Sequence, residues 1–182
     1  MTTAVLLFFL LLWPAAGAAS GLESYFGAYV GYAEVEDLDE QKRETREIDV
    51  VIRPYRRHGF QIHAVNVSLV RGRRDLPGVV RRERRVAFLP SSTGSYYVEA
   101  PAYNPFRERE ERAAVEGRPL RWAVLDESGL YEYSFQVLED GRFELQIFRR
   151  WPERDGLGLE FQRIVDGKVE KRIRGHAVRA AP

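Results

Sequence analysis

The fold is decided by the run Tyr131-Glu-Tyr-Ser-Phe-Gln-Val137, the turn Glu139-Asp-Gly141 and the run Phe143-Glu-Leu-Gln-Ile147. Apolar and polar residues alternate on both sides of the Asp-Gly pair. A period of two is typical of strands with one buried and one solvated face, and Asp-Gly between two such runs is a strong hairpin signal. We therefore expect the odd-numbered residues of both runs to be buried and the even-numbered ones to be solvated.

The same alternation continues to the end of the chain. Leu157, Leu159, Phe161 and Val165 precede a second Asp-Gly pair, and Val169, Ile173 and Ala177 follow it. Residues 120 to 178 thus predict five strands joined by hairpins. A meander of this length must close or cover its edges to avoid pairing with other chains.

The first half of the chain predicts about five further strands, over residues 21–35, 46–54, 60–70, 79–89 and 95–100. Residues 36–47 are polar and acidic and predict a loop. Residues 106–115, bracketed by prolines, predict two helical turns. With no repeat and no Ser/Gly-rich linker, we expect a single domain. The fold class predicted is all-β, an antiparallel meander barrel of about 8–10 strands.

The N-terminus predicts a signal peptide over residues 1–19, followed by a barrel domain over residues 20–182. An apolar run of ten (residues 4–13) is followed by Pro14 and small residues, the pattern of a secretory signal. A membrane-spanning helix needs about 20 apolar residues. We therefore expect export to the periplasm or outside the cell. The chain has no cysteine, which excludes disulfides, thiolate metal sites and a cysteine nucleophile.

Ten short strands behind a signal peptide resemble the calycin barrels, the architecture of the lipocalins. Gly27-Ala28-Tyr29 resembles the lipocalin first-strand motif Gly-x-Trp, with tyrosine in place of tryptophan. The resemblance implies that Arg163, on the inward parity of a late strand, packs over that aromatic ring. Residues 72–78, 131–147 and 156–167 also resemble an uncharacterised family of exported bacterial proteins, which implies no activity. Fold alone does not license a function.

The predicted inward aromatic face is the main candidate site. It comprises Tyr29, Trp122, Tyr131, Tyr133, Phe135 and Phe161, with Arg163 beside them. Small barrels are either filled by side chains or hold one small ligand, so a packed core and a binding cavity are both open. Arg163 could bind a ligand carboxylate or close the barrel end against an aromatic ring. We expect a non-enzymatic protein that binds an apolar or amphipathic molecule; a lipocalin-fold isomerase or cyclase with a tyrosine as acid or base is a further alternative.

A basic hairpin is the second candidate. Residues 71–85 contain seven arginines, Arg71, Arg73, Arg74, Arg81, Arg82, Arg84 and Arg85. This segment could contact an anionic membrane surface or an acidic partner, giving a cavity-free envelope protein. The other interpretation is a solvated hairpin that is neutralised by acidic neighbours. Nucleic acid is not expected, because stacking aromatics are not interleaved with the arginines.

No metal or cofactor site is predicted. His58, His63 and His176 lack the spacing of metal ligands, and the outward parity of His176 disfavours a haem ligand. Glu132, Glu144 and Glu160 lie on the face that we expect to be solvated, which predicts a surface row rather than a glycosidase pair.

Overall fold

The computed structural model describes residues 21–101 and 118–180, which form one closed antiparallel barrel. Each strand pairs with the next along the chain, and the last strand pairs with the first. A 3₁₀ helix, η1 (Leu22–Tyr25), precedes β1 (Gly27–Asp37), β2 (Lys42–Tyr55), β3 (Gly59–Ser68), β4 (Val80–Pro90), β5 (Tyr97–Glu99), β6 (Leu120–Asp126), β7 (Gly129–Val137), β8 (Phe143–Pro152), β9 (Gly156–Val165) and β10 (Lys168–Arg179). The predicted all-β meander barrel is confirmed.

One predicted boundary is wrong. The loop expected over residues 36–47 shrinks to a turn at 38–41, because β1 and β2 stay paired as far as Asp37 opposite Lys42. Charged residues continue these strands since the barrel end is open to solvent and alternate side chains there point outward. The predicted signal peptide over residues 1–19 and the predicted helical turns over residues 106–115 lie outside the described residues.

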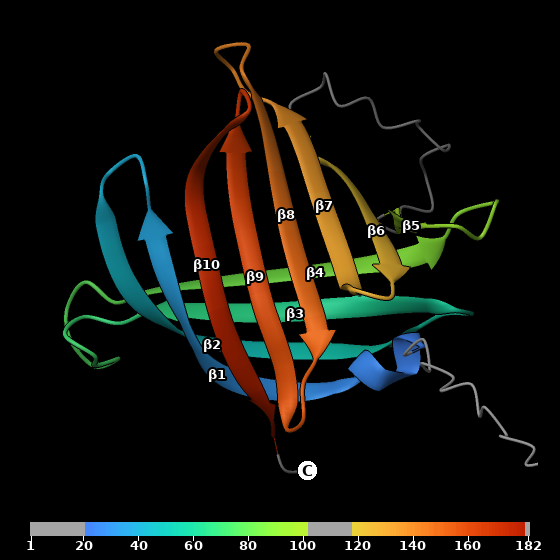
Figure 1. Cartoon of the computed structure of the whole chain (residues 1–182), viewed down its shortest axis with the longest axis horizontal. Helices are drawn as coiled ribbons and strands as arrows, with labels where there is room; N and C mark the ends of the chain where they lie inside the picture. Colours follow the sequence, from blue (N-terminus) through green and yellow to red (C-terminus); the bar gives the residue numbers. More distant parts are fainter. Residues whose placement is uncertain (1–20, 102–117, 181–182) are drawn as a thin grey trace, which may run out of the picture.

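The barrel is strongly curled. Figure 1 shows β6–β10 crossing in front of β2–β4 at a steep angle, the arrangement of two orthogonally packed sheets that share corners. At Gly31 on β1, a Cβ atom would overlap the backbone of His176 on β10. Glycine at this position is therefore required for the close contact of β1 and β10 that closes the barrel.

One end of the barrel is packed solid. Tyr25, Tyr29, Phe60 and Phe88 are fully buried there. The ring centres of Phe60 and Phe88 lie 5.1 Å apart, and Tyr97 meets Phe60 edge-on at the same distance. Helix η1 contributes Leu22 and Tyr25 to this core. Helix η1 therefore covers this end of the barrel and forms part of its core.

Three strands of the terminal meander, β6, β7 and β8, turn the opposite face inward from the one predicted, whereas β9 and β10 point Leu157 and Ala177 inward as expected. On β7, Glu132 is fully buried and Ser134 is nearly so, whereas Tyr131, Tyr133 and Phe135 are only half-buried. The register fixes the orientation, since Glu132 lies opposite the buried Ala123 on β6. The alternation correctly predicted a strand, but the side assigned to the barrel interior was wrong for β6, β7 and β8.

Candidate functional site

The other half of the barrel contains a cavity of about 600 Å³ between β2, β3, β4, β8, β9 and β10. One part of its wall is apolar and comprises Ile48, Val50, Ala64, Phe148, Leu159, Phe161 and Ile173. The rings of Phe148 and Phe161 lie 4.5 Å apart at its side. A volume of this size is in the range of small-molecule sites. The sequence left a packed core and a cavity both open, and the barrel has both: one end is packed and the other contains the cavity.

Two arginines that share one glutamate lie at the inner end of the cavity. Arg84 of β4 makes a bidentate ion pair with Glu132 of β7, with one of its two bonds at 2.9 Å. Arg150 of β8 donates to the same carboxylate at 3.4 Å. Because β5 and β6 lie between β4 and β7 in the sheet, the Arg84–Glu132 pair crosses the barrel interior.

This group carries one positive charge in excess. Both arginines also contact the ring of Phe148, at 4.3 Å for Arg84 and 5.6 Å for Arg150. The side chain of Arg150 is 4% exposed, and its Nε has no hydrogen-bond partner in the described part of the chain. A buried donor of this kind is costly to leave unpaired, so it is an available contact for an acceptor atom.

The pKa values of the three groups reflect this geometry. Burial alone would raise the pKa of Glu132, but the charges and hydrogen bonds of the arginines outweigh it and hold the pKa below its ordinary value. Burial, together with the neighbouring Arg84 cation, lowers the pKa of Arg150, and the attraction of Glu132 opposes that shift. An arginine remains protonated even so. The group of Arg84, Arg150 and Glu132 therefore keeps two cations for one buried anion at neutral pH.

The mouth of the cavity is also basic. Arg46, Arg82 and Lys171 line both the cavity and an open groove of about 710 Å³ at the barrel rim. Arg46 is paired with Glu44, and Lys171 with Asp37 at 2.7 Å. Arg82 is exposed and makes no ion pair within residues 21–101 and 118–180. An approaching anion thus meets positive charge first at the rim and again at depth.

The predicted site residues divide between the two faces. Tyr29 and Phe161 point inward, as expected, but Tyr29 lies in the packed end and Phe161 in the cavity wall. Trp122, Tyr131, Tyr133 and Phe135 lie on the outer face, so the expectation that they converge inside the barrel is wrong. The physical reason is that β7 uses its polar face to supply Glu132 to the interior arginines.

Arg163 points inward but does not contact Tyr29. Its Nε donates to Glu144 at 2.5 Å and its Nη1 to Glu170 at 2.7 Å, both near the open end. Arg179 of β10 packs on Tyr29 instead, 5.0 Å from the ring centre, and donates to its hydroxyl at 2.9 Å. An arginine from a late strand therefore packs on the aromatic ring of β1 as expected, but it is Arg179 and not Arg163.

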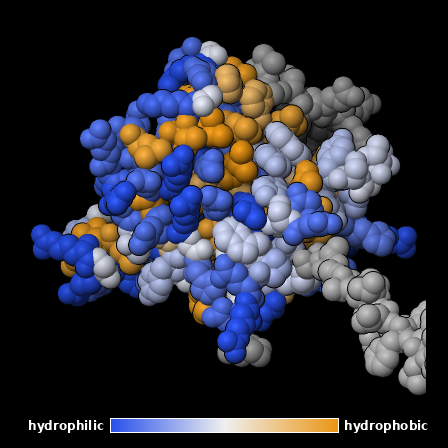
Figure 2. Space-filling model, in the orientation of Figure 1, coloured by the Kyte–Doolittle hydropathy of each residue, from blue (hydrophilic) through white to orange (hydrophobic). Residues whose placement is uncertain are grey.

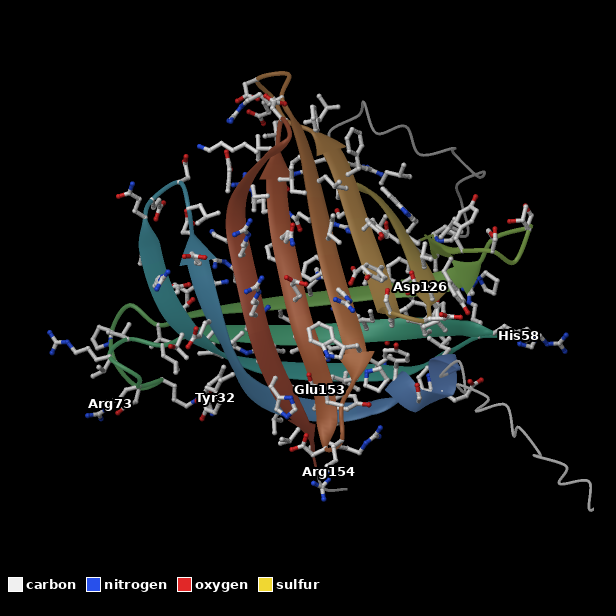
Figure 3. The ribbon with its side chains drawn as sticks, in the orientation of Figure 1. Tyr32, His58, Arg73, Asp126, Glu153 and Arg154 are labelled. Atoms are coloured by element: carbon white, nitrogen blue, oxygen red, sulfur yellow. The ribbon has the colours of Figure 1, made fainter. Side chains whose placement is uncertain are left out.

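The basic hairpin is largely neutralised within the chain. Arg73 pairs with Asp75, Arg74 with Glu47, Arg81 with Glu83, and Arg84 with Glu132 inside the barrel. Arg71, Arg82 and Arg85 make no ion pair in the described residues. Figure 3 shows Arg73 at the far end of the β3–β4 loop, pointing to solvent. A role of this hairpin toward anionic lipid or an acidic partner remains a prediction.

The remaining sequence candidates have mixed outcomes. His176 lies outside the barrel against Glu153 and Asp155, and within the described residues no group of His, Asp or Glu could hold a metal ion. Glu160 lies on the outer face as expected. Glu132 and Glu144 are buried, so the predicted surface row is wrong. No helix in residues 21–101 or 118–180 is long and apolar enough to cross a membrane.

Sequence reasoning missed the Arg84–Glu132–Arg150 group, although one signal was present. Arg84 has the same parity as Val86 and Phe88, which were expected to point inward. An inward arginine needs an acidic partner. Glu132 has the same parity as the apolar Leu130, and an inward Leu130 would have indicated that Glu132 also points inward. No family model and no curated protein matches the chain.

Proposed function

We propose that the chain is a lipocalin-like, exported binding protein that holds a small amphipathic anion in its barrel. The supporting observation is the cavity of about 600 Å³ whose apolar wall ends at two arginines sharing one carboxylate. The apolar part of the ligand lies along Leu159, Phe161 and Ile173. Its anionic group lies near Arg84 and Arg150, where it accepts from the unpartnered Nε.

Charge and shape both support this ligand class. A neutral apolar molecule would leave the excess positive charge of the Arg84–Glu132–Arg150 group uncompensated, whereas a carboxylate, sulfate or phosphate ester balances it. A fully polar anion would leave the apolar wall unused. The excess charge at the mouth favours the approach of anions by long-range attraction. An amphipathic anion satisfies all three conditions.

The test compares two fluorescent probes that differ only in the head group. A dansyl-labelled medium-chain fatty acid and its methyl ester are titrated into the full chain, and emission of the dansyl group reports binding. We expect the acid to bind more tightly than the ester. Native mass spectrometry of protein from the expressing cell gives an independent view, because a retained ligand can be identified by its mass.

Variants then locate the head group. Arg150→Met should weaken the acid about 10- to 100-fold, since hydrogen bonds to charged groups contribute about 1.5–3 kcal/mol, and should leave the ester nearly unchanged. Arg53→Met, on the outer face of β2 beside Gln61, is the matched control and should change neither affinity. Equal binding of acid and ester, or equal effects of the two variants, would exclude this site for the anion.

A further inference from the structure

The wall of the cavity on β8, β9 and β10 is arranged in layers. One row of register partners is apolar and comprises Phe148, Phe161 and Ile173. The next inward row toward the rim is polar and comprises Gln146, Arg163 and Lys171. On the other side of the apolar row, Arg150 is the next inward residue of β8. The apolar layer therefore lies between a polar layer at the rim and a cation at depth.

The opposite wall, on β3 and β4, has the same order. Ala64 and Arg84 are register partners, and the next inward pair toward the rim is Asn66 and Arg82. Residues two apart on a strand are separated by about 7 Å, and residues four apart by about 13 Å. The rim layer therefore lies about 7 Å from Arg84 along β4 and about 13 Å from Arg150 along β8.

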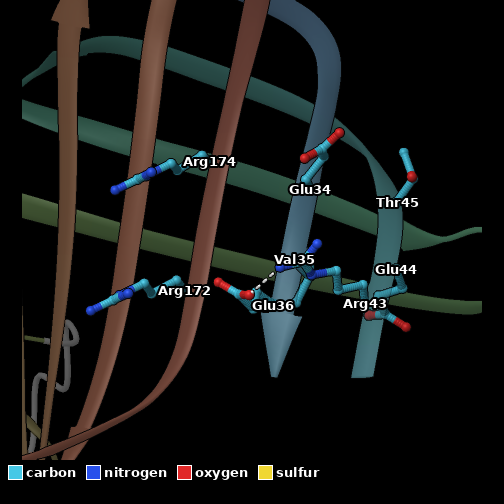
Figure 4. Close-up of a pocket in the computed structure, with 8 residues that line it drawn as sticks. All are labelled: Glu34, Val35, Glu36, Arg43, Glu44, Thr45, Arg172 and Arg174. Carbon is cyan, nitrogen blue, oxygen red and sulfur yellow. Dashed lines mark hydrogen bonds and ion pairs between the residues drawn. The ribbon is translucent and has the colours of Figure 1, made fainter. Parts of the chain in front are cut away.

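Two polar side chains of the rim layer have no partner. The cations Arg46, Arg163 and Lys171 of this layer each pair with an acidic residue. On the outer side of β1 and β2, Arg43 likewise donates to Glu36 at 2.7 Å (Figure 4). The side chains of Arg82 and Asn66, by contrast, make no hydrogen bond or ion pair within the described part of the chain. Both therefore have donors available for an acceptor at the rim.

The rim end of the cavity is open to water. Arg82 lines both the cavity and the groove at the rim, so it is accessible from both. Figure 2 shows hydrophilic, blue atoms at the left edge of the molecule, over the β1–β2 turn and the β3–β4 loop that border this groove. An apolar chain end placed here would remain in contact with water, whereas an ionised end stays hydrated and can pair with Arg82.

We propose that the ligand carries an acidic group at each end and is a medium-chain α,ω-dicarboxylate. This inference rests on the anion site proposed at Arg84 and Arg150, which holds one carboxylate. The other carboxylate accepts from Arg82 and Asn66 at the rim, and the methylene chain between them packs on the apolar layer. A fatty acid with one carboxylate would satisfy only one of the two polar layers.

The test compares dicarboxylic acids with their monomethyl esters by isothermal titration calorimetry on the full chain at neutral pH. Octanedioic, decanedioic and dodecanedioic acid cover the separation of the two layers. We expect the best diacid to bind about tenfold more tightly than its half-ester, the lower end for hydrogen bonds to charged groups, because Arg82 is exposed. The difference should shrink in high salt, since an exposed contact is screened.

Variants locate the second carboxylate. Arg82→Met should lower the affinity of the diacid to that of the half-ester and leave the half-ester unchanged. Arg85→Met is the matched control, because Arg85 is also exposed and makes no ion pair in the described residues, but lies on the outer face of β4 opposite His63. It should change neither affinity.

The outcomes separate this inference from the one on which it rests. If the half-ester binds and the diacid binds no more tightly, the rim contact is refuted while the site at Arg84 and Arg150 stands. If neither ligand binds, both proposals are refuted. A preference for the diacid that survives in Arg82→Met, or that is lost equally in Arg85→Met, also refutes the rim contact.

Discussion

Replacing Glu132 by glutamine tests the electrostatics of the interior most directly. The change keeps the shape of the side chain and removes its charge. Arg150, 4% exposed, then loses its only ion pair within residues 21–101 and 118–180, and Arg84 loses a bidentate one. Removing one partner of a buried pair costs about 3–5 kcal/mol, because the remaining charge is buried without compensation. Arg84 is 28% exposed and keeps some hydration, so we expect about 3–4 kcal/mol for Glu132→Gln.

The assay is urea unfolding followed by tryptophan fluorescence, since urea does not screen charges as a guanidinium salt does. Glu160→Gln is the matched control. Glu160 meets Arg174 on the outer face, where Arg174 is 74% exposed, and a surface pair of this kind is worth about 0–1 kcal/mol. A second variant, Glu132→Gln with Arg150→Met, should recover most of the loss, because it removes the uncompensated buried cation.

The pH dependence gives a further check with a definite sign. The pKa of Glu132 is held below its ordinary value of 4.5 in the folded chain. The contribution of the ionised carboxylate to stability is therefore complete above the unfolded pKa and is lost as pH falls through the folded pKa. The free-energy difference between wild type and Glu132→Gln should be largest near neutral pH and shrink below about 4.5. A loss no larger than that of Glu160→Gln at neutral pH would refute the buried charge cluster.

Two further expectations concern the packed end and the outer face of β8 and β9. Tyr29→Phe removes the hydroxyl that donates to the carbonyl of Tyr25 and accepts from Arg179, each at 2.9 Å, and should cost about 1–2 kcal/mol in urea unfolding, whereas Tyr32→Phe should cost nothing measurable. Gly158→Ala makes a Cβ overlap the indole ring of Trp151, so the ring must move. We expect the tryptophan emission to shift, and Trp151→Phe gives the part of that emission that comes from Trp151. An unchanged emission spectrum in Gly158→Ala would contradict the packing.

The strand order could be predicted from the sequence because each hairpin is a local signal. Asp-Gly at residues 140–141 and 166–167 sits at the turns that join β7 to β8 and β9 to β10. Both glycines have positive φ, 83° at Gly141 and 80° at Gly167, the conformation that such turns require. Alternation then fixes strand identity without any knowledge of the partner strand.

Alternation alone does not say which face is inside. On β7 the two faces differ by one residue of register, and the hydrophobic criterion selects Tyr131, Tyr133 and Phe135 for the interior. The chain places Glu132 there instead, because Arg84 and Arg150 are already inside and need a counter-ion. That constraint is non-local: Glu132 and Arg84 are 48 positions apart in the sequence. A prediction strand by strand could not contain it.

The inversion links the cavity to the outer face of β6–β8. Turning the polar face of β7 inward supplies Glu132 to the arginines and, by the period of two, turns Tyr131 and Tyr133 outward. The inward carboxylate of Glu132 and the outward rings of Tyr131 and Tyr133 are therefore neighbours in the sequence. An all-apolar interior would have satisfied the hydrophobic criterion, but it would have left Arg84 and Arg150 without a counter-ion. The polarity across β6–β8 is therefore set by the charge pairing of the interior and not by the hydrophobic alternation of each strand alone.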